Sequence, residues 1–101
     1  MTFPEKLNHL LVKSKIATDG EKEVALRVAR LKLRNEAENG ADTIEVSHFE
    51  WMLRNDAIVK RRVRRSAFSD VVRHAKETLI SEGLTIKKSS DGWTEYFYWG
   101  S

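Results

Sequence analysis

The chain has 101 residues, 41% hydrophobic and 33% charged, with a formal net charge of +3, and this length predicts one domain over residues 1–101 with a modest core. It has no cysteine, which excludes disulfides and thiolate metal sites. It also lacks a long apolar run and a signal-peptide pattern, so we expect a cytoplasmic protein with no membrane partner.

The first expected element is a helix that begins near Thr2 and Pro4. Proline is favoured there because its missing amide hydrogen costs nothing in the first turn. Apolar residues follow at helical spacing at Leu7, Leu10 and Leu11. The helix should end near Ile16, since Thr18-Asp19-Gly20 reads as a break.

A second helix is expected from Glu21 to about Glu38, with Asp19 as its cap and Asn39-Gly40 closing it. The residues expected to face inward are Val24, Ala25, Val28, Ala29 and Leu31. Leu26 and Leu33 lie off this stripe, seven residues apart. Either they widen the core face or they mark a homodimer interface on residues 21–38. Residues 1–40 would thus form the helical N-terminal part.

Residues 43–46, Thr-Ile-Glu-Val, alternate polar and apolar side chains, which predicts a short strand. Ser47 and Glu50 have the spacing of a capping box, in which each side chain satisfies the backbone of the other. We therefore expect a supporting helix that begins at Ser47 and ends near Asn55 or Asp56.

The tract from Asp56 to Arg65, DAIVKRRVRR, concentrates positive charge. Residues 54–76 contain eight Lys or Arg and two Asp or Glu, for a net +6, which is the pattern of a phosphate-binding surface. Three structures stay open: a further helical turn from residues 57–59, an elongated basic loop, or one longer helix that continues into the next element.

That next element is an amphipathic helix. Ser66 and Ser69 are acceptable N-caps, and Asp70 suits the positive end of the helix dipole. Gly83 is a typical helix stop, and Leu84 can fold back on the last apolar turn. The residues that form one buried stripe are Phe68, Val71, Val72, Ala75 and Leu79.

A β-hairpin is expected at the C-terminus. Residues 84–88 and 93–99 favour strands, and Asp91-Gly92 is a strong signal for a two-residue turn. This turn predicts that Lys88 faces Glu95 and that Ile86 faces Phe97. The other expected pairs are Lys87 with Tyr96, Thr85 with Tyr98, Ser90 with Trp93, and Leu84 with Trp99.

A helix that ends in Glu-Gly-Leu and leads into a two-stranded ribbon resembles the second half of a winged helix-turn-helix domain. The resemblance rests on residues 66–99, about a third of the chain, and chiefly on SDVVRHAKETLISEGL. It implies an α+β, mostly helical fold in which residues 66–82 form a recognition helix for the DNA major groove. The hairpin would be the wing, paired with the strand at 43–46. The family turn before the recognition helix is only a few residues long, whereas residues 56–65 provide about ten.

The candidate phosphate contacts of the tract are Lys60, Arg61, Arg62, Arg64 and Arg65. The alternatives for this tract are a solvated surface segment and a localisation signal. On the helix, Ser66, Ser69, Arg73 and Lys76 form one exposed row. By resemblance Arg73 reaches a base edge, and the alternative is an ion pair with Asp70 or Glu77. Lys87 and Lys88 of the wing would touch phosphates, with Glu95 as a competing partner for Lys88.

The sequence has no His-Glu-x-x-His motif and no glycine loop that could cradle a phosphate, so we expect no enzymatic activity and no cofactor. The alternative is a nuclease site from Asp42, Glu45 and Glu50, although acidic residues near a helix start are usually capping and surface groups. The sequence predicts a duplex-DNA-binding protein, a transcriptional regulator or an accessory factor of replication or recombination in a bacterium or phage. The alternatives are a protein-interaction module, such as a phage-encoded inhibitor of a host protein, and a binder of structured RNA. DNA binding predicts one continuous positive face over the tract, Arg73 and the wing.

Overall fold

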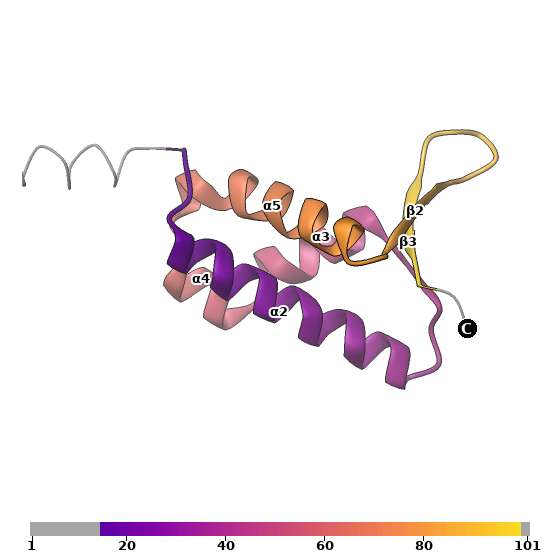
Figure 1. The fold of residues 1–101 in the computed structure, drawn as a ribbon, viewed down its shortest axis with the longest axis horizontal. Coiled ribbons are helices and arrows are strands. Elements are labelled where there is room, and N and C mark those ends of the chain that lie inside the picture. Colours follow the sequence, from indigo (N-terminus) through magenta and orange to yellow (C-terminus); the bar gives the residue numbers. More distant parts are fainter. Residues whose placement is uncertain (1–14, 100–101) are drawn as a thin grey trace, which may run out of the picture.

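The structure is a computed structural model that describes residues 15–99 (Figure 1). The helix expected over residues 2–16 therefore falls almost wholly outside the described residues. The remaining chain has an α+β fold that is mainly helical. In order, its elements are α2 (Asp19–Glu38), β1 (Thr43–Glu45), α3 (Val46–Arg54), α4 (Ala57–Arg62), the 3-10 turn η1 (Arg65–Ala67), α5 (Phe68–Ser81), β2 (Thr85–Lys88) and β3 (Glu95–Tyr98).

Helix α2 begins two residues earlier than expected, and its cap is Thr18 rather than Asp19. The Glu21 amide donates to Thr18 Oγ1 at 3.2 Å, and the Thr18 amide donates to Glu21 Oε1 at 3.0 Å. This reciprocal pair is a capping box, which satisfies two backbone donors at once. The expected end is confirmed, with Asn39 as the C-cap and Gly40 at a φ of +93°.

The buried stripe of α2 differs from the expected one. Leu31 was expected to face inward but is 47% exposed, whereas Leu33 is 9% exposed and belongs to the core. The buried positions advance four residues at a time, from Ala25 through Ala29 to Leu33, so the stripe turns away from Leu31. Leu26 packs against the core, so Leu26 and Leu33 widen the core face.

Helix α3 follows β1 without a loop, and the capping box expected at Ser47 is absent. The N-cap is Glu45, the last residue of β1, and Val46 is already helical and buried. Ser47 Oγ instead donates to Glu45 Oε1 at 2.6 Å. The expected helix end is confirmed, since Asn55 is the C-cap.

Helix α5 carries the expected apolar stripe, of which only Phe68 is partly exposed. It begins at Phe68 after η1, and its cap, Ala67, has no side-chain hydrogen bond, so Ser66 and Ser69 are not its caps. Its expected end is confirmed. Gly83 has a φ of +113°, and the Leu84 amide bonds back to the Leu79 carbonyl at 3.0 Å.

The three strands form one antiparallel sheet in the order β1-β3-β2. The expected pairing of residues 85–88 with 95–98 is confirmed, as is pairing of the strand at 43–45 with this ribbon. The turn is longer than expected, and Ser90 and Trp93, which we expected to pair, both lie in it. The Ser89 amide bonds to the Thr94 carbonyl at 2.8 Å and the Gly92 amide to the Ser89 carbonyl at 2.9 Å, which leaves residues 90–93 as a four-residue loop.

Helices α2 and α5 lie side by side and run in the same direction (Figure 1). Both begin at the end of the molecule that holds α4, and the hairpin projects from the opposite end. The core joins the helices to the sheet through Phe49 of α3, whose ring meets Phe97 of β3 edge to face at 5.1 Å.

Candidate nucleic-acid interface

The basic tract forms a separate helix, α4, so the elongated loop and the single long helix are both wrong. Asp56 caps it by accepting from the amides of Ile58 at 2.8 Å and Val59 at 3.1 Å. Val59 is buried, as is Val63 directly after the helix. These anchors hold α4 to the core and leave the exposed cations Lys60, Arg61 and Arg62 on its outer side.

Arg64 is not on this outer surface. Its backbone amide donates to Glu21 Oε2 at 2.8 Å, its Nη2 lies 2.8 Å from Glu21 Oε1, and its Nη2 also donates to the Ile16 carbonyl at 2.8 Å. The Arg64 side chain is 23% exposed and that of Glu21 8%. We expected Arg64 to bind phosphate, but the structure places it in a partly buried internal ion pair.

The Glu21 carboxylate is strongly favoured in its ionised form. Burial raises its pKa, but hydrogen bonds from the Arg64 side chain and from the amides of Thr18 and Arg64 outweigh this effect. They lower the pKa of Glu21 from an ordinary 4.5 to about 2. The pair fixes the start of α2 against the link between α4 and α5.

On α5, Arg73 forms ion pairs with Asp70 and with Glu77, the latter at 3.4 Å. The alternative to base contact, pairing along the helix, is therefore what the structure shows. Asp70 also accepts from the Ala17 amide at 2.8 Å, and this bond together with Arg73 lowers the pKa of Asp70. Lys76, next on the same row, lies 3.1 Å from Glu50 of α3.

The β2–β3 hairpin presents Lys87 and Lys88, both exposed. Lys87 Nζ lies 3.7 Å from the centroid of the Tyr98 ring, so the expected lysine–tyrosine contact forms with the diagonal neighbour rather than with Tyr96. Lys88 is opposite Glu95 in the ladder. At the tip, Trp93 is 88% exposed.

Sequence reasoning missed a basic groove between the end of α3, α4 and the start of α5. Its volume is about 620 Å³. Three cations, Arg54, Lys60 and Arg65, line it, and Ser69 adds a hydroxyl. Val59, Val63 and Phe68 supply its apolar part, and the Arg54 guanidinium lies 5.2 Å from the centroid of the Phe68 ring. Arg54 is the last residue of α3, a helix that the sequence indicated only as a support for α5, so its position did not indicate a binding residue.

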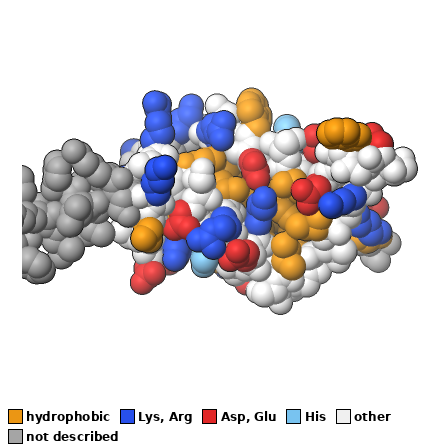
Figure 2. Space-filling model, turned by 90° about the horizontal axis from the view of Figure 1, so that it is seen from above, with side chains coloured by type: hydrophobic (Ala, Val, Ile, Leu, Met, Phe, Trp, Pro, Cys, Tyr) orange, Lys and Arg blue, Asp and Glu red, His pale blue; other side chains and the backbone are white. Residues whose placement is uncertain are grey.

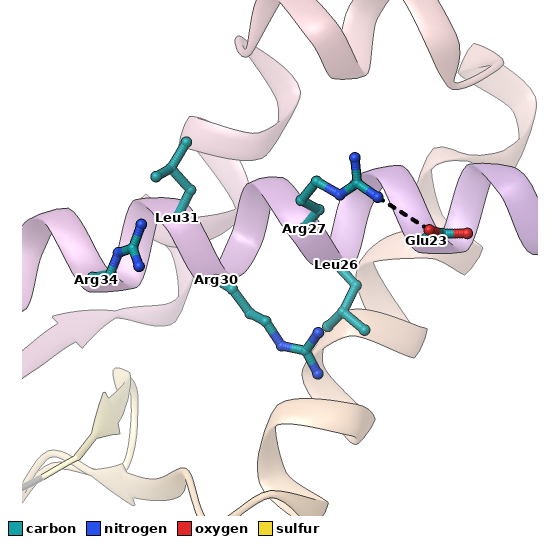
Figure 3. Close-up of a pocket in the computed structure, with 6 residues that line it drawn as sticks. All are labelled: Glu23, Leu26, Arg27, Arg30, Leu31 and Arg34. Carbon is teal, nitrogen blue, oxygen red and sulfur yellow. Dashed lines mark hydrogen bonds and ion pairs between the residues drawn. The ribbon is translucent and has the colours of Figure 1, made fainter.

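A second hollow, on the outer face of α2, also contains three arginines (Figure 3). Here each arginine has a carboxylate partner: Arg27 with Glu23, Arg30 with Glu82, and Arg34 with Glu38. Leu31 lies beside them, so a homodimer through residues 21–38 would bury Leu31 and three arginines.

Pairing divides the cations of residues 54–76 into two groups. Arg64, Arg73 and Lys76 have carboxylate partners. Among residues 15–99 no carboxylate lies within 4 Å of the other five, which are Arg54, Lys60, Arg61, Arg62 and Arg65. Figure 2 views the molecule from above α5 and shows Lys and Arg side chains gathered toward the end opposite the β2–β3 hairpin. Toward the hairpin, acidic and hydrophobic side chains are prominent. Arg73 and Lys76 lie between the two ends of α5, and both form ion pairs. The continuous positive face that we expected over the tract, Arg73 and the hairpin is therefore interrupted.

No protein-family model, curated protein or solved structure matches this chain. Within residues 15–99, no group of three His, Asp or Glu side chains could hold a metal ion. No helix of that same range is long and apolar enough to cross a membrane.

Proposed function

We propose that this chain is a non-enzymatic winged-helix protein that binds duplex DNA through the end of the molecule that carries α4. The observation that carries the proposal is that five cations of residues 54–65 lack carboxylate partners among the described residues, while the cations farther along α5 are paired. A cation without an internal partner is available to replace the counterions around a phosphate. Regulation of transcription, or an accessory role in replication or recombination, is the corresponding cellular function.

The order of elements supports a winged helix. Helix α2, strand β1, helices α3 and α5, and the β2–β3 ribbon follow one another, and the ribbon pairs with β1 in the order β1-β3-β2. In this assignment α5 is the recognition helix and the ribbon is the wing. Helix α4, inserted between α3 and α5, is the departure that lengthens the usual turn.

The length of α5 suits a position across the major groove. Its 14 residues span about 21 Å at about 1.5 Å per residue, and the major groove is about 12 Å wide. Cations at the α4 end and the wing lysines at the other end can therefore reach the two backbones that border the groove. Ser66, near the start of α5, would approach the bases, and the paired Arg73 would contribute less than the sequence indicates.

Substitution of the two outermost arginines of α4 tests this proposal. In the variant Arg61→Gln with Arg62→Gln, the dependence of log K on log salt for a labelled duplex should become shallower by about 1.8, since each lost phosphate contact contributes about 0.9. Fluorescence anisotropy across a salt series measures this slope. Arg27→Gln with Arg34→Gln removes the same charge from α2 and should leave the slope unchanged. Equal slopes for the two variants would contradict the proposal.

A second candidate function, a protein-interaction module, is favoured by the interruption of the expected positive face at Arg73 and Lys76 and by two exposed aromatic side chains. Trp93 at the wing tip is 88% exposed, and Trp51 of α3 is 59% exposed and stacks on His48 at 5.8 Å. Tryptophan is enriched at the centres of protein interfaces. Failure of the wild-type protein to bind duplex DNA at low salt would favour this function.

A further inference from the structure

The two hollows on the surface differ in how their charge is balanced. Each is lined by three cations, but in the α2 hollow every arginine has a carboxylate partner. The groove between α3, α4 and α5 is lined by Arg54, Lys60 and Arg65 without any acidic residue. Like charges that share a concave surface repel one another and focus the field in it, so this groove attracts an anion.

Three different elements bring these cations to one place. Arg54 is the last residue of α3, Lys60 belongs to α4, and Arg65 begins η1. Asp56 is the acidic residue between them in sequence, but it caps α4 and lies 3.5 Å from Lys32 of α2. Because Asp56 is directed to α2 and does not line the groove, an anion from outside is the natural counter-charge.

The residues that line the groove indicate which kind of anion it can bind. Val59, Val63 and Phe68 line it together with the three cations. Phe68 is only partly buried, and the Arg54 guanidinium lies against its ring. An occupant must therefore present both negative charge and carbon surface. A deoxyribose with its phosphate has both, since the sugar face is largely C–H and the phosphate oxygens accept charge-assisted hydrogen bonds.

We infer that this groove seats one deoxyribose–phosphate unit of bound duplex DNA, with Arg54, Lys60 and Arg65 converging on a single phosphate. The inference rests on the proposed function and adds that three cations act on one phosphate rather than on three. The Ser69 hydroxyl donates to the same phosphate. Arg61 and Arg62 do not line the groove, and they hold neighbouring phosphates.

The number of phosphates lost on substitution tests this inference. The triple variant Arg54→Gln, Lys60→Gln and Arg65→Gln should make the salt slope for a labelled duplex shallower by about 0.9, because one phosphate contact is lost. Any single substitution should leave the slope nearly unchanged, since two cations still hold that phosphate. The charge-matched control is the triple α2 variant Arg27→Gln, Arg30→Gln and Arg34→Gln, whose slope should equal that of the wild type.

The outcomes separate the groove from the wider proposal. If the salt slope of the triple variant becomes shallower by about 2.7, the three cations bind three separate phosphates. If the slope does not change, the groove faces away from DNA. Either result overturns the inference while leaving duplex binding intact. If the wild type binds no duplex, the proposed function and the inference both fail. Circular dichroism checks that each variant is folded. If the triple variant unfolds, the double variant Lys60→Gln with Arg65→Gln replaces it, because this variant keeps Arg54 against Phe68. This pair removes two of the three cations, so one shared phosphate predicts an intermediate loss below 0.9, whereas separate phosphates predict about 1.8.

Discussion

Glu21 explains why Arg64, alone among the arginines of the basic tract, forms an internal ion pair in the described residues. This carboxylate caps α2 through Thr18 and binds both the backbone and the side chain of Arg64. The pair joins residues 43 positions apart in the chain. A buried carboxylate with several hydrogen bonds is costly to leave without its partners, so both residues are needed together.

Substitution of this carboxylate should lower stability. We expect Glu21→Gln to reduce the free energy of unfolding by about 3 kcal/mol, because Arg64 then loses a partner in a partly buried site. Urea denaturation followed by circular dichroism measures the loss. Glu23→Gln, which removes an exposed ion pair with Arg27, is the control and should change the free energy by less than about 0.5 kcal/mol. Similar effects for the two variants would contradict the structural role of Glu21.

The same pair makes stability depend on pH in the acid range. The pKa of Glu21 is about 2 in the folded chain, below its ordinary 4.5, so folding favours the ionised form. The contribution of Glu21 to the free energy of unfolding is therefore fully present above about pH 4.5 and decreases as the pH falls toward 2. The difference in unfolding free energy between the wild type and Glu21→Gln should therefore shrink over this window, and a constant difference would contradict the assignment.

At the scale of elements, the sequence correctly predicted features that depend on residues close together in the chain. The apolar stripe of α5 and the hairpin register follow from periodicity and pairing within residues 66–99, and both are confirmed. The burial of Leu33 in place of Leu31 depends on which elements pack against α2, and the sequence pattern fits either stripe. The cap of α3 is Glu45 because β1 runs directly into the helix. The capping box predicted from the spacing of Ser47 and Glu50 is therefore wrong.

Two glycines provide a test of how the helices begin and end. Gly83 has a φ of +113°, so Gly83→Ala should destabilise the protein by about 1 kcal/mol or more. Gly20 lies within the first turn of α2 with ordinary dihedrals, and a Cβ there would meet only Thr18 Oγ1 at 4.0 Å. Gly20→Ala should therefore stabilise by about 0.5–1 kcal/mol. Thermal unfolding of both variants checks the opposite signs, and equal signs would contradict the helix boundaries.

At the scale of the whole molecule, the sequence predicted where positive charge concentrates but not which of these cations form ion pairs. Residues 54–76 carry a net +6, yet three of their eight cations are paired. Arg64 pairs with a residue of α2, and Lys76 with a residue of α3. Such long-range pairs could not be read from the spacing of the basic residues. The cations without carboxylate partners in the described residues form one basic end, and a separate pair of lysines lies on the β2–β3 hairpin.

The most direct test of this account is the salt dependence of binding of the wild-type protein to a labelled random duplex, compared with a matched single strand. One phosphate in the groove, with one each for Arg61, Arg62, Lys87 and Lys88, gives about five contacts and a duplex slope near −4.5. We expect such a slope and weaker binding to the single strand, which lacks a second backbone across the groove. No duplex binding at low salt, or equal affinity for the two probes, would contradict the account.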